Sequence, residues 1–237
     1  MIPWCLMQMM SRVIACGLLL FAPCVYAQDN PLERRVSDFD SKGAGLTETL
    51  LKFSHEQHLP IAIQYLDRTS MDQPVEICMR NVTIGQALDS ILHSGKGYRW
   101  RLRNGIIEVT NRHASPHAEH QLNQVIPVFR ISEGQTVEMT SAMLWWNLQL
   151  ALDPSVKGFA GDVMGGSSTV KPATLRHRTV REILSYIVLN SQAEGWIVAG
   201  PPECLGYTPY CGLWYFIEPE PSGASYPVVL QKIRGNL

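Results

Sequence analysis

The sequence predicts an α+β fold made of two small repeated units, each with two helices packed on short β-sheets in the order βαββαββ. One observation is an ungapped match between residues 82–92 and residues 178–188. A second is that apolar residues recur at matching helical positions in both segments, so each helix carries one buried stripe. A third is that each segment opens with a capping box, which can satisfy two orphan amides at a helix start: Thr83 with Gln86, and Thr179 with Glu182. A repeated unit of this kind favours a scaffold for contacts over an active site.

The N-terminal segment, residues 1–27, has the pattern of a secretory signal peptide. Arg12 forms a short positive region, residues 13–21 are apolar, and Val25-Tyr26-Ala27 is a small-x-small cleavage pattern. The apolar run is shorter than the roughly 20 residues that a membrane-spanning helix needs. We therefore expect export of a chain cleaved after Ala27, with lipid attachment at Cys24 or an uncleaved anchor as alternatives.

The composition bounds the class of protein. The chain has 237 residues, a formal net charge of −1 and no basic run, so it lacks the electrostatic footprint of a nucleic-acid-binding protein. No other apolar stretch approaches membrane-spanning length. We expect these boundaries after the signal peptide: a lead-in at residues 28–35, a first unit at 36–110, a polar linker at 111–123, a second unit at 124–218 and a tail at 219–237.

The first unit begins with a strand at residues 36–39. An amphipathic helix follows from Leu46 through Phe53, and Pro60 stops it. Branched and alternating apolar residues then predict strands at 61–65 and 75–79, before the first capped helix at 84–93. Asn104-Gly105 is a strong hairpin signal between two further strands, at residues 98–102 and 106–109.

The second unit starts with a strand at residues 125–129. A helix at about 137–150 follows, and its apolar residues are expected on one side: Met139, Met143, Leu144 and Trp146 or Leu148. Next come an insert at 158–168, a strand near 173–175 and the second capped helix. Strands at 195–198 and 213–217 close the sheet, and residues 228–230 are a candidate edge strand. Alternation along the last closing strand sends Trp214 and Phe216 to one face and Tyr215 to the other.

Parts of the chain are similar to the secretin and TonB short N-terminal domain, or STN domain. Phe39-Asp40 precedes the helix at Leu46 as in that family, and Gly43 and Gly45 lie where the family has small residues. The agreement continues through residues 59–63, 82–88 and 98–100. The resemblance covers about residues 36–109 well, and residues 125–217 only in their later half. Because the matching residues are mostly at core and helix-cap positions, they indicate the fold more strongly than the function.

The resemblance implies a role in protein contacts at a bacterial envelope. In secretins such modules form periplasmic rings beneath an outer-membrane pore, and in TonB-dependent transducers one such domain contacts a periplasmic anti-sigma regulator. We accordingly expect a non-enzymatic adaptor, or an assembly or signalling component, in the periplasm or at the outer membrane of a Gram-negative-type bacterium. Its partner would be a secretin, a TonB-dependent receptor, a periplasmic regulator or a second copy of the chain. We expect no cofactor.

Residues 202–212 read as a turn-rich loop that a Cys204–Cys211 disulfide is expected to close, because export permits oxidation. Two thiols alone supply too few ligands for a metal site. Aromatic and apolar residues on constrained or inserted loops are good contact groups, and four form the candidate partner-contact set: Tyr207, Tyr210, Phe159 and Met164. Cys78, an odd thiol in a strand, is more typical of a structural than of a reactive cysteine.

The remaining motifs favour neither a metal site nor catalysis. His55 and His58 do not have zinc-protease spacing. The linker contains a histidine cluster that could bind Zn²⁺ or Cu²⁺: His113, His117 and His120. A linker, however, supplies no packed residues around these side chains to hold them in place. The glycine-rich insert lacks the nucleophile of a trypsin-like protease. Two alternatives stay open, a small-ligand or glycan-binding module using the aromatic loop and a hydrolase, although the sequence offers no nucleophile–base set for the latter.

Overall fold

The computed structural model describes residues 30–66, 72–94, 97–112, 121–155, 157, 166–199, 213–219 and 231. A short 3-10 helix, η2 (Pro31–Glu33), comes first. The first half then contains β1 (Arg35–Gly45), α1 (Leu46–Gln57), β2 (Ile61–Leu66), β3 (Pro74–Thr83), α3 (Ile84–Ser94), β4 (Tyr98–Arg103) and β5 (Ile106–Asn111). The second half contains β6 (Val125–Ile131), α5 (Val137–Leu152), β7 (Ala173–Thr179), α6 (Val180–Leu189), β8 (Gly195–Ala199) and β9 (Leu213–Ile217).

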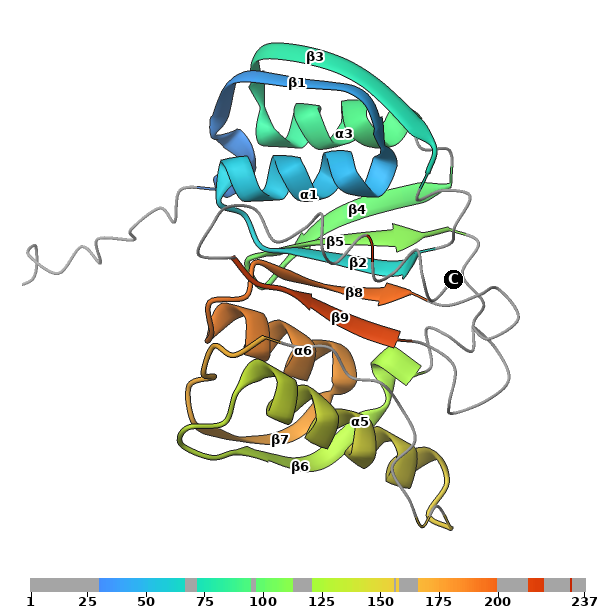
Figure 1. Ribbon diagram of the computed structural model, residues 1–237, viewed down its shortest axis with the longest axis vertical. Helices are drawn as coiled ribbons and strands as arrows, with labels where there is room; N and C mark the ends of the chain where they lie inside the picture. Colours follow the sequence, from blue (N-terminus) through green and yellow to red (C-terminus); the bar gives the residue numbers. More distant parts are fainter. Residues whose placement is uncertain are drawn as a thin grey trace, which may run out of the picture.

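These elements stack as five layers, which Figure 1 shows from top to bottom. A two-stranded sheet, β1–β3, covers α1 and α3, which lie on a central five-stranded sheet. Helices α5 and α6 cover the other face of that sheet, and the two-stranded sheet β6–β7 covers them in turn. The predicted α+β class is confirmed.

The central sheet joins the two halves of the chain. Its strand order is β4-β5-β2-β8-β9. Strand β2 lies in the middle and pairs in parallel with β5 on one side and with β8 on the other. Hairpin pairs β4–β5 and β8–β9 flank it and are both antiparallel. The two halves therefore share one sheet.

Both predicted capping boxes are present. The Thr83 N–H donates to Gln86 Oε1 at 2.9 Å, and the Gln86 N–H donates to Thr83 Oγ1 at 3.2 Å. The same reciprocal pair forms between Thr179 and Glu182, at 2.9 and 3.2 Å. Each box satisfies two amides that the first helical turn leaves without intrahelical partners, so α3 and α6 begin where the sequence predicts.

The strands that lead into these helices also share an unusual backbone geometry. Asn81 and His177, each two residues before a cap threonine, have φ values of 54° and 49°. In each half the first helical amide then donates to the residue before the first strand: Ile84 N to Arg34 O and Val180 N to Gln124 O, both at 3.0 Å. The described residues of the second half run βαβαββ and include no strand matching β2, so the complete repeat stays a prediction.

The predicted hairpin at Asn104-Gly105 is also present. Arg103 pairs with Ile106, which leaves a two-residue turn between β4 and β5. Asn104 and Gly105 have φ values of 51° and 82°, the left-handed geometry that a type I′ turn requires at both positions. This turn sets the register of β4, the strand on which the candidate site lies.

Two apolar cores lie on opposite faces of the central sheet. Tyr215 belongs to the core beneath α1 and α3, whereas Trp214 and Phe216 belong to the core against α5 and α6. The predicted alternation of the last strand is therefore confirmed. Trp145 of α5 meets Trp214 edge to face, with ring centroids 4.8 Å apart and an interplanar angle of 87°, a favoured arrangement for an aromatic pair.

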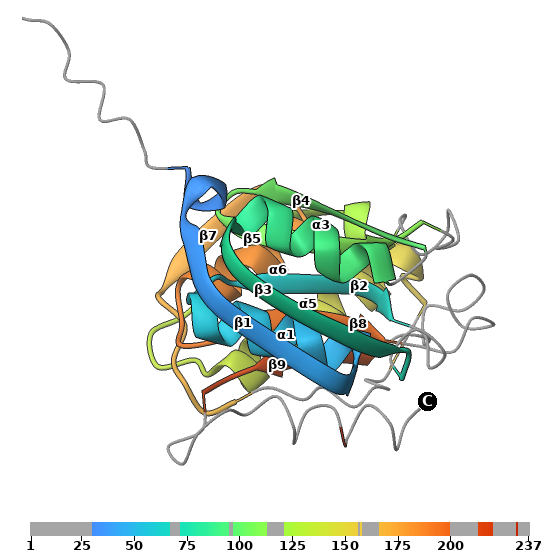
Figure 2. The same ribbon diagram turned by 90° about the horizontal axis from the view of Figure 1, so that it is seen from above.

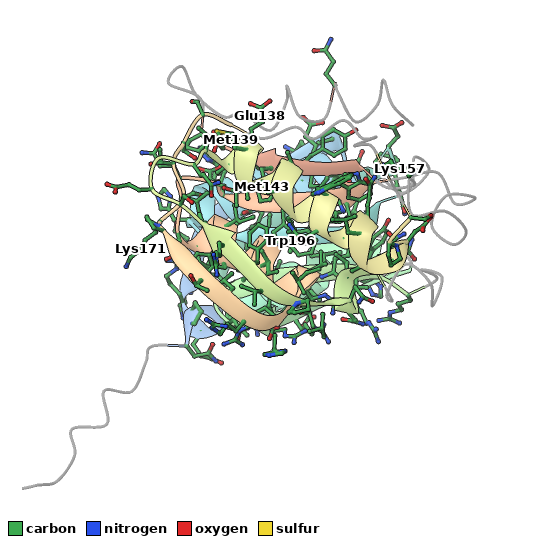
Figure 3. All side chains as sticks on the ribbon, turned by 90° about the horizontal axis from the view of Figure 1, so that it is seen from below. Glu138, Met139, Met143, Lys157, Lys171 and Trp196 are labelled. Carbon is green, nitrogen blue, oxygen red and sulfur yellow. The ribbon has the colours of Figure 1, made fainter. Side chains whose placement is uncertain are left out.

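The predicted buried face of α5 is partly wrong. Met139 and Met143 are 53% and 38% exposed and lie one turn apart on the outward side of the helix (Figure 3). Leu144 and Leu148 are buried as expected, but Trp145 rather than Trp146 is buried beside them. Polar residues also occupy the inward face: Thr140, Ser141 and Gln149. Apolar residues lie on all sides of α5, so their spacing does not select a face.

Strand β1 is longer than expected: the prediction covered residues 36–39, and the strand continues to Gly45. Gly43, with a φ of 70°, lies at the register shift between Lys42 and Ala44. Glycine reaches this conformation without a Cβ penalty, which explains how β1 bends there and still pairs with β3. The candidate edge strand at residues 228–230 lies outside the described residues.

Candidate interaction site at the edge of the central sheet

The two outermost strands of the central sheet differ in exposure. In β9, the four residues from Trp214 to Ile217 are only 2–4% exposed. In β4, Arg99 and Arg101 are exposed, and Trp100, Leu102 and Arg103 are half-buried. Figure 2 shows β4 at the margin of the molecule beside α3. Of the strands that the structure describes in this sheet, β4 is therefore the one that offers an accessible edge.

The pairing of β4 with β5 shows which backbone groups point to that edge. The Arg112 N–H donates to the Gly97 carbonyl at 2.6 Å just before β4. Because hydrogen-bonded and non-hydrogen-bonded pairs alternate along an antiparallel ladder, Arg99, Arg101 and Arg103 make the hydrogen bonds to β5. The N–H and C=O groups of the three intervening residues, Tyr98, Trp100 and Leu102, then point outward.

The side chains of β4 divide into a basic and an apolar face. Tyr98 belongs to the core beneath α1 and α3, and Trp100 and Leu102 pack against the same core. The arginines alternate with these residues, so Arg99, Arg101 and Arg103 lie on the opposite face of the strand. The accessible edge therefore has apolar side chains on the α3 side and cationic side chains on the other side.

One arginine of this face is held by a buried carboxylate. Arg101 Nε lies 2.7 Å from Glu108 Oε2, and the side chains of Arg101 and Glu108 are 52% and 1% exposed. A carboxylate as buried as Glu108 needs a charged partner. The ion pair thus fixes Arg101 across the β4–β5 ladder.

A groove of about 580 Å³ runs between α3 and β4. The Trp100 Nε1–H donates to Asp89 Oδ1 at 2.7 Å, which holds the indole ring against α3. Residues of α3 and β4, the residue just before β4 and the residue just after β5 line the groove: Asp89, Leu92, His93, Gly97, Tyr98, Arg99, Trp100 and Arg112. We name β4 (Tyr98–Arg103) together with this groove the β4 edge site.

A smaller cavity of about 320 Å³ lies near the hairpin turn, lined by Asn104 and by residues of β7 and α6. Glu182, one of its lining residues, has a lowered carboxyl pKa, mainly because it accepts the Thr179 backbone N–H. The Thr179 hydroxyl and the charges of Arg178 and Arg103 lower it further. This carboxylate is therefore committed to the helix cap.

The contact residues predicted from the loops lie outside the described residues. These are Tyr207, Tyr210, Phe159 and Met164, and the predicted Cys204–Cys211 disulfide and the cluster of His113, His117 and His120 lie outside them as well. Cys78 is a free, exposed cysteine on β3, opposite Asp40 in the register. His55 Nδ1 lies 2.9 Å from a carboxylate oxygen of Glu194, so this histidine bridges α1 and the segment before β8.

Within the ranges that the structure describes, no cluster of His, Cys, Asp and Glu is arranged to hold a metal ion. No helix in those ranges is long and apolar enough to span a membrane.

No protein-family model matches this sequence. A search of curated proteins gives no significant match either. The resemblance to the STN domain therefore depends on the motifs quoted above and stays a prediction.

The β4 edge site was not among the sequence-predicted contact residues. Its signal is present in the sequence, because three arginines alternate with Tyr98, Trp100 and Leu102. That alternation predicts a strand with two different faces, but it does not say that the strand is outermost in its sheet. Strand order supplied the missing information.

Proposed function

We propose that this protein is an exported, non-enzymatic interaction module of the bacterial envelope, and that it binds a partner protein through the β4 edge site. An adaptor or an assembly or signalling component that contacts a secretin, a TonB-dependent receptor or a periplasmic regulator fits the resemblance to STN domains. The signal-peptide pattern of residues 1–27 supports export.

The observation that carries this proposal is the accessible edge of β4 beside a groove. An exposed strand presents unpaired N–H and C=O groups that template pairing with another chain. Adding a strand to a sheet edge is a general mode of peptide recognition, in which backbone hydrogen bonds give affinity and adjacent pockets give specificity. The β4 edge site combines the outward backbone groups of Trp100 and Leu102 with such a pocket.

The chemistry of the groove also favours binding. Arg112 supplies a cationic hydrogen-bond donor, Trp100 supplies an aromatic edge, and the Asp89 carboxylate accepts the hydrogen bond of the indole N–H. These groups suit recognition of a chain with carboxylates and apolar side chains.

Site-specific photo-cross-linking in the native cell envelope tests the proposal. A photoreactive amino acid at His93, an exposed groove residue, should link the protein to one envelope protein. The same group at Arg176, exposed on β7 in the outermost layer on the other side, is the matched control. Absence of an adduct at position 93, or equal adducts at both positions, would contradict the proposal.

The groove also supports a second candidate function, a periplasmic module for a small anionic ligand or glycan. A groove of about 580 Å³ with two arginines and an aromatic side chain is within the size range of ligand sites. Thermal stabilisation by anionic envelope glycans, lost in Arg112→Ala, combined with no protein adduct at position 93, would favour this candidate over the first.

A further inference from the structure

The two faces of β4 define the kind of chain that could pair with it. We infer that the partner contributes an extended segment in which acidic and apolar residues alternate, and that this segment adds to the central sheet beside β4. The inference rests on the proposed function and specifies the partner chemistry of the same site.

Backbone geometry sets the length and position of the segment. Trp100 and Leu102 direct their N–H and C=O groups away from β5, so both residues can exchange hydrogen bonds with an added strand. Both lie within the six-residue strand β4. A partner segment of about six residues would pair along the whole of this strand.

The arginine face selects for acidic residues. Side chains directly opposite each other in neighbouring strands point to the same side of the sheet. Partner residues opposite Arg99, Arg101 and Arg103 would therefore meet guanidinium groups. Arg101 already pairs with Glu108, and Arg103 lies close enough to Glu182 to lower the pKa of that carboxyl group, whereas Arg99 forms no ion pair to a described carboxylate. Partner carboxylates at alternate positions would complement this charge, and basic residues there would repel it.

The α3 side selects for apolar residues at the intervening positions. Partner residues opposite Trp100 and Leu102 would point toward the groove, where Leu92 and Trp100 provide apolar contact. The partner therefore needs the period-two alternation of a strand with one apolar face and one acidic face.

The same charges disfavour pairing of β4 with itself. In a two-fold antiparallel pairing of two β4 strands, opposite residues share a face, so arginines stand opposite arginines in every register. Like charges directly opposite each other destabilise a strand pair, and charged edge strands protect against such association. This argues for a foreign acidic strand over a symmetric dimer through β4.

Peptide binding to the purified protein tests the inference, with fluorescence anisotropy as the readout. The probe has an alternating Glu/Val core of about six residues, matched to β4. One control has the same composition with the glutamates and valines in separate blocks, and another alternates Lys with Val. We expect the alternating acidic peptide to bind at least about tenfold more tightly than either control, and to weaken as NaCl rises from about 50 mM to about 500 mM.

Two variants separate the charge and backbone contributions. Arg99→Glu should weaken binding about five- to tenfold, because an exposed attractive pair becomes repulsive. Leu102→Pro and Leu102→Ala both remove the leucine side chain, but only proline removes the outward N–H, and a proline is tolerated where a strand N–H faces away from its neighbour. We expect Leu102→Pro to bind clearly more weakly than Leu102→Ala, with both variants folded by circular dichroism.

Three results would overturn the inference: equal binding of the alternating and block peptides, indifference to Arg99→Glu, or equal binding by the two Leu102 variants. Concentration-dependent self-association that Leu102→Pro abolishes would also overturn it, because a second copy would then occupy the edge. The proposed function fails separately, if no envelope protein cross-links at position 93. An adduct at position 93 without peptide preference would leave the proposed function standing and refute the partner chemistry.

Discussion

Replacing Gly195 with alanine tests whether the contact between β2 and β8 holds the two halves together. Gly195 is the first residue of β8 and stands opposite Ile61 of β2. A Cβ added at Gly195 would lie 2.2 Å from the Ile61 carbonyl oxygen, and 3.1 Å from both Ile217 Cδ1 and Ile61 Cγ2. The nearest obstacle is backbone, which cannot rotate away as a side chain can.

The magnitude follows from this geometry. Ordinary carbon–oxygen contacts start at about 3.3 Å, so β2 and β8 must separate by about 1 Å at this point. The adjacent hydrogen bonds, Ile61 N to Glu194 O at 3.0 Å and Glu194 N to Ile217 O at 2.6 Å, would be strained or lost. Overpacking costs about 1–3 kcal/mol and each lost hydrogen bond about 1 kcal/mol. We expect Gly195→Ala to lower the free energy of unfolding by about 3–5 kcal/mol.

Urea unfolding followed by tryptophan fluorescence measures this change, because Trp196 of β8 and Trp214 of the neighbouring β9 are both buried. Gly85→Ala is the matched control. A Cβ at Gly85, in the first turn of α3, meets no atom closer than 3.8 Å, so alanine should stabilise the helix by up to about 1 kcal/mol. A Gly195→Ala protein within about 0.5 kcal/mol of the parent, a change typical of surface substitutions, would refute the reasoning.

Three other predictions concern the cap and the buried ion pair. Thr179→Ala removes the hydroxyl that accepts the Glu182 N–H and should cost about 1 kcal/mol in the same urea titration; no loss would contradict the role of the cap. The pKa of Glu182 is lowered in the folded state, mainly by the Thr179 backbone N–H. The ionised Glu182 therefore stabilises the fold fully at pH values above the ordinary carboxyl pKa, and this contribution is lost as the pH falls through the lowered pKa of the folded state. In Glu182→Gln the melting temperature should therefore fall less steeply as the pH is lowered into the acidic range. An unchanged dependence on pH would count against this role of Glu182. Arg101→Met should cost about 2 kcal/mol, since it leaves the buried Glu108 carboxylate without its cation; adding Glu108→Met should restore stability, and a double variant no more stable than Arg101→Met would disprove the pairing argument.

The fold could be predicted from the sequence where a local signal decides the structure. Helix starts at Thr83 and Thr179 and the turn at Asn104-Gly105 depend on neighbouring residues alone, and all were predicted correctly. The buried face of α5 was not, because Met139 and Met143 have the spacing of a core stripe but the opposite side of the helix packs inward. Pairing of β2 with β8 leaves no local mark, since it joins strands from different halves.

The candidate site was less predictable than the fold for a related reason. Arg99, Arg101 and Arg103 can be seen to alternate along one predicted strand. Whether those arginines face solvent, a neighbouring strand or a helix depends on the order of strands in a sheet built from both halves. The groove likewise needs the position of α3 relative to β4. Site prediction therefore required tertiary structure although the residues themselves were visible.

The central position of β2 has a consequence for how the chain folds. Strand β2 lies in the first half of the fold and its partner β8 in the second half, so their contact joins residues far apart in the sequence and cannot form before both halves are present. Until β8 arrives, the incomplete sheet offers a hydrophobic, unpaired edge at Ile61 and Ile63, a form prone to mispairing and aggregation.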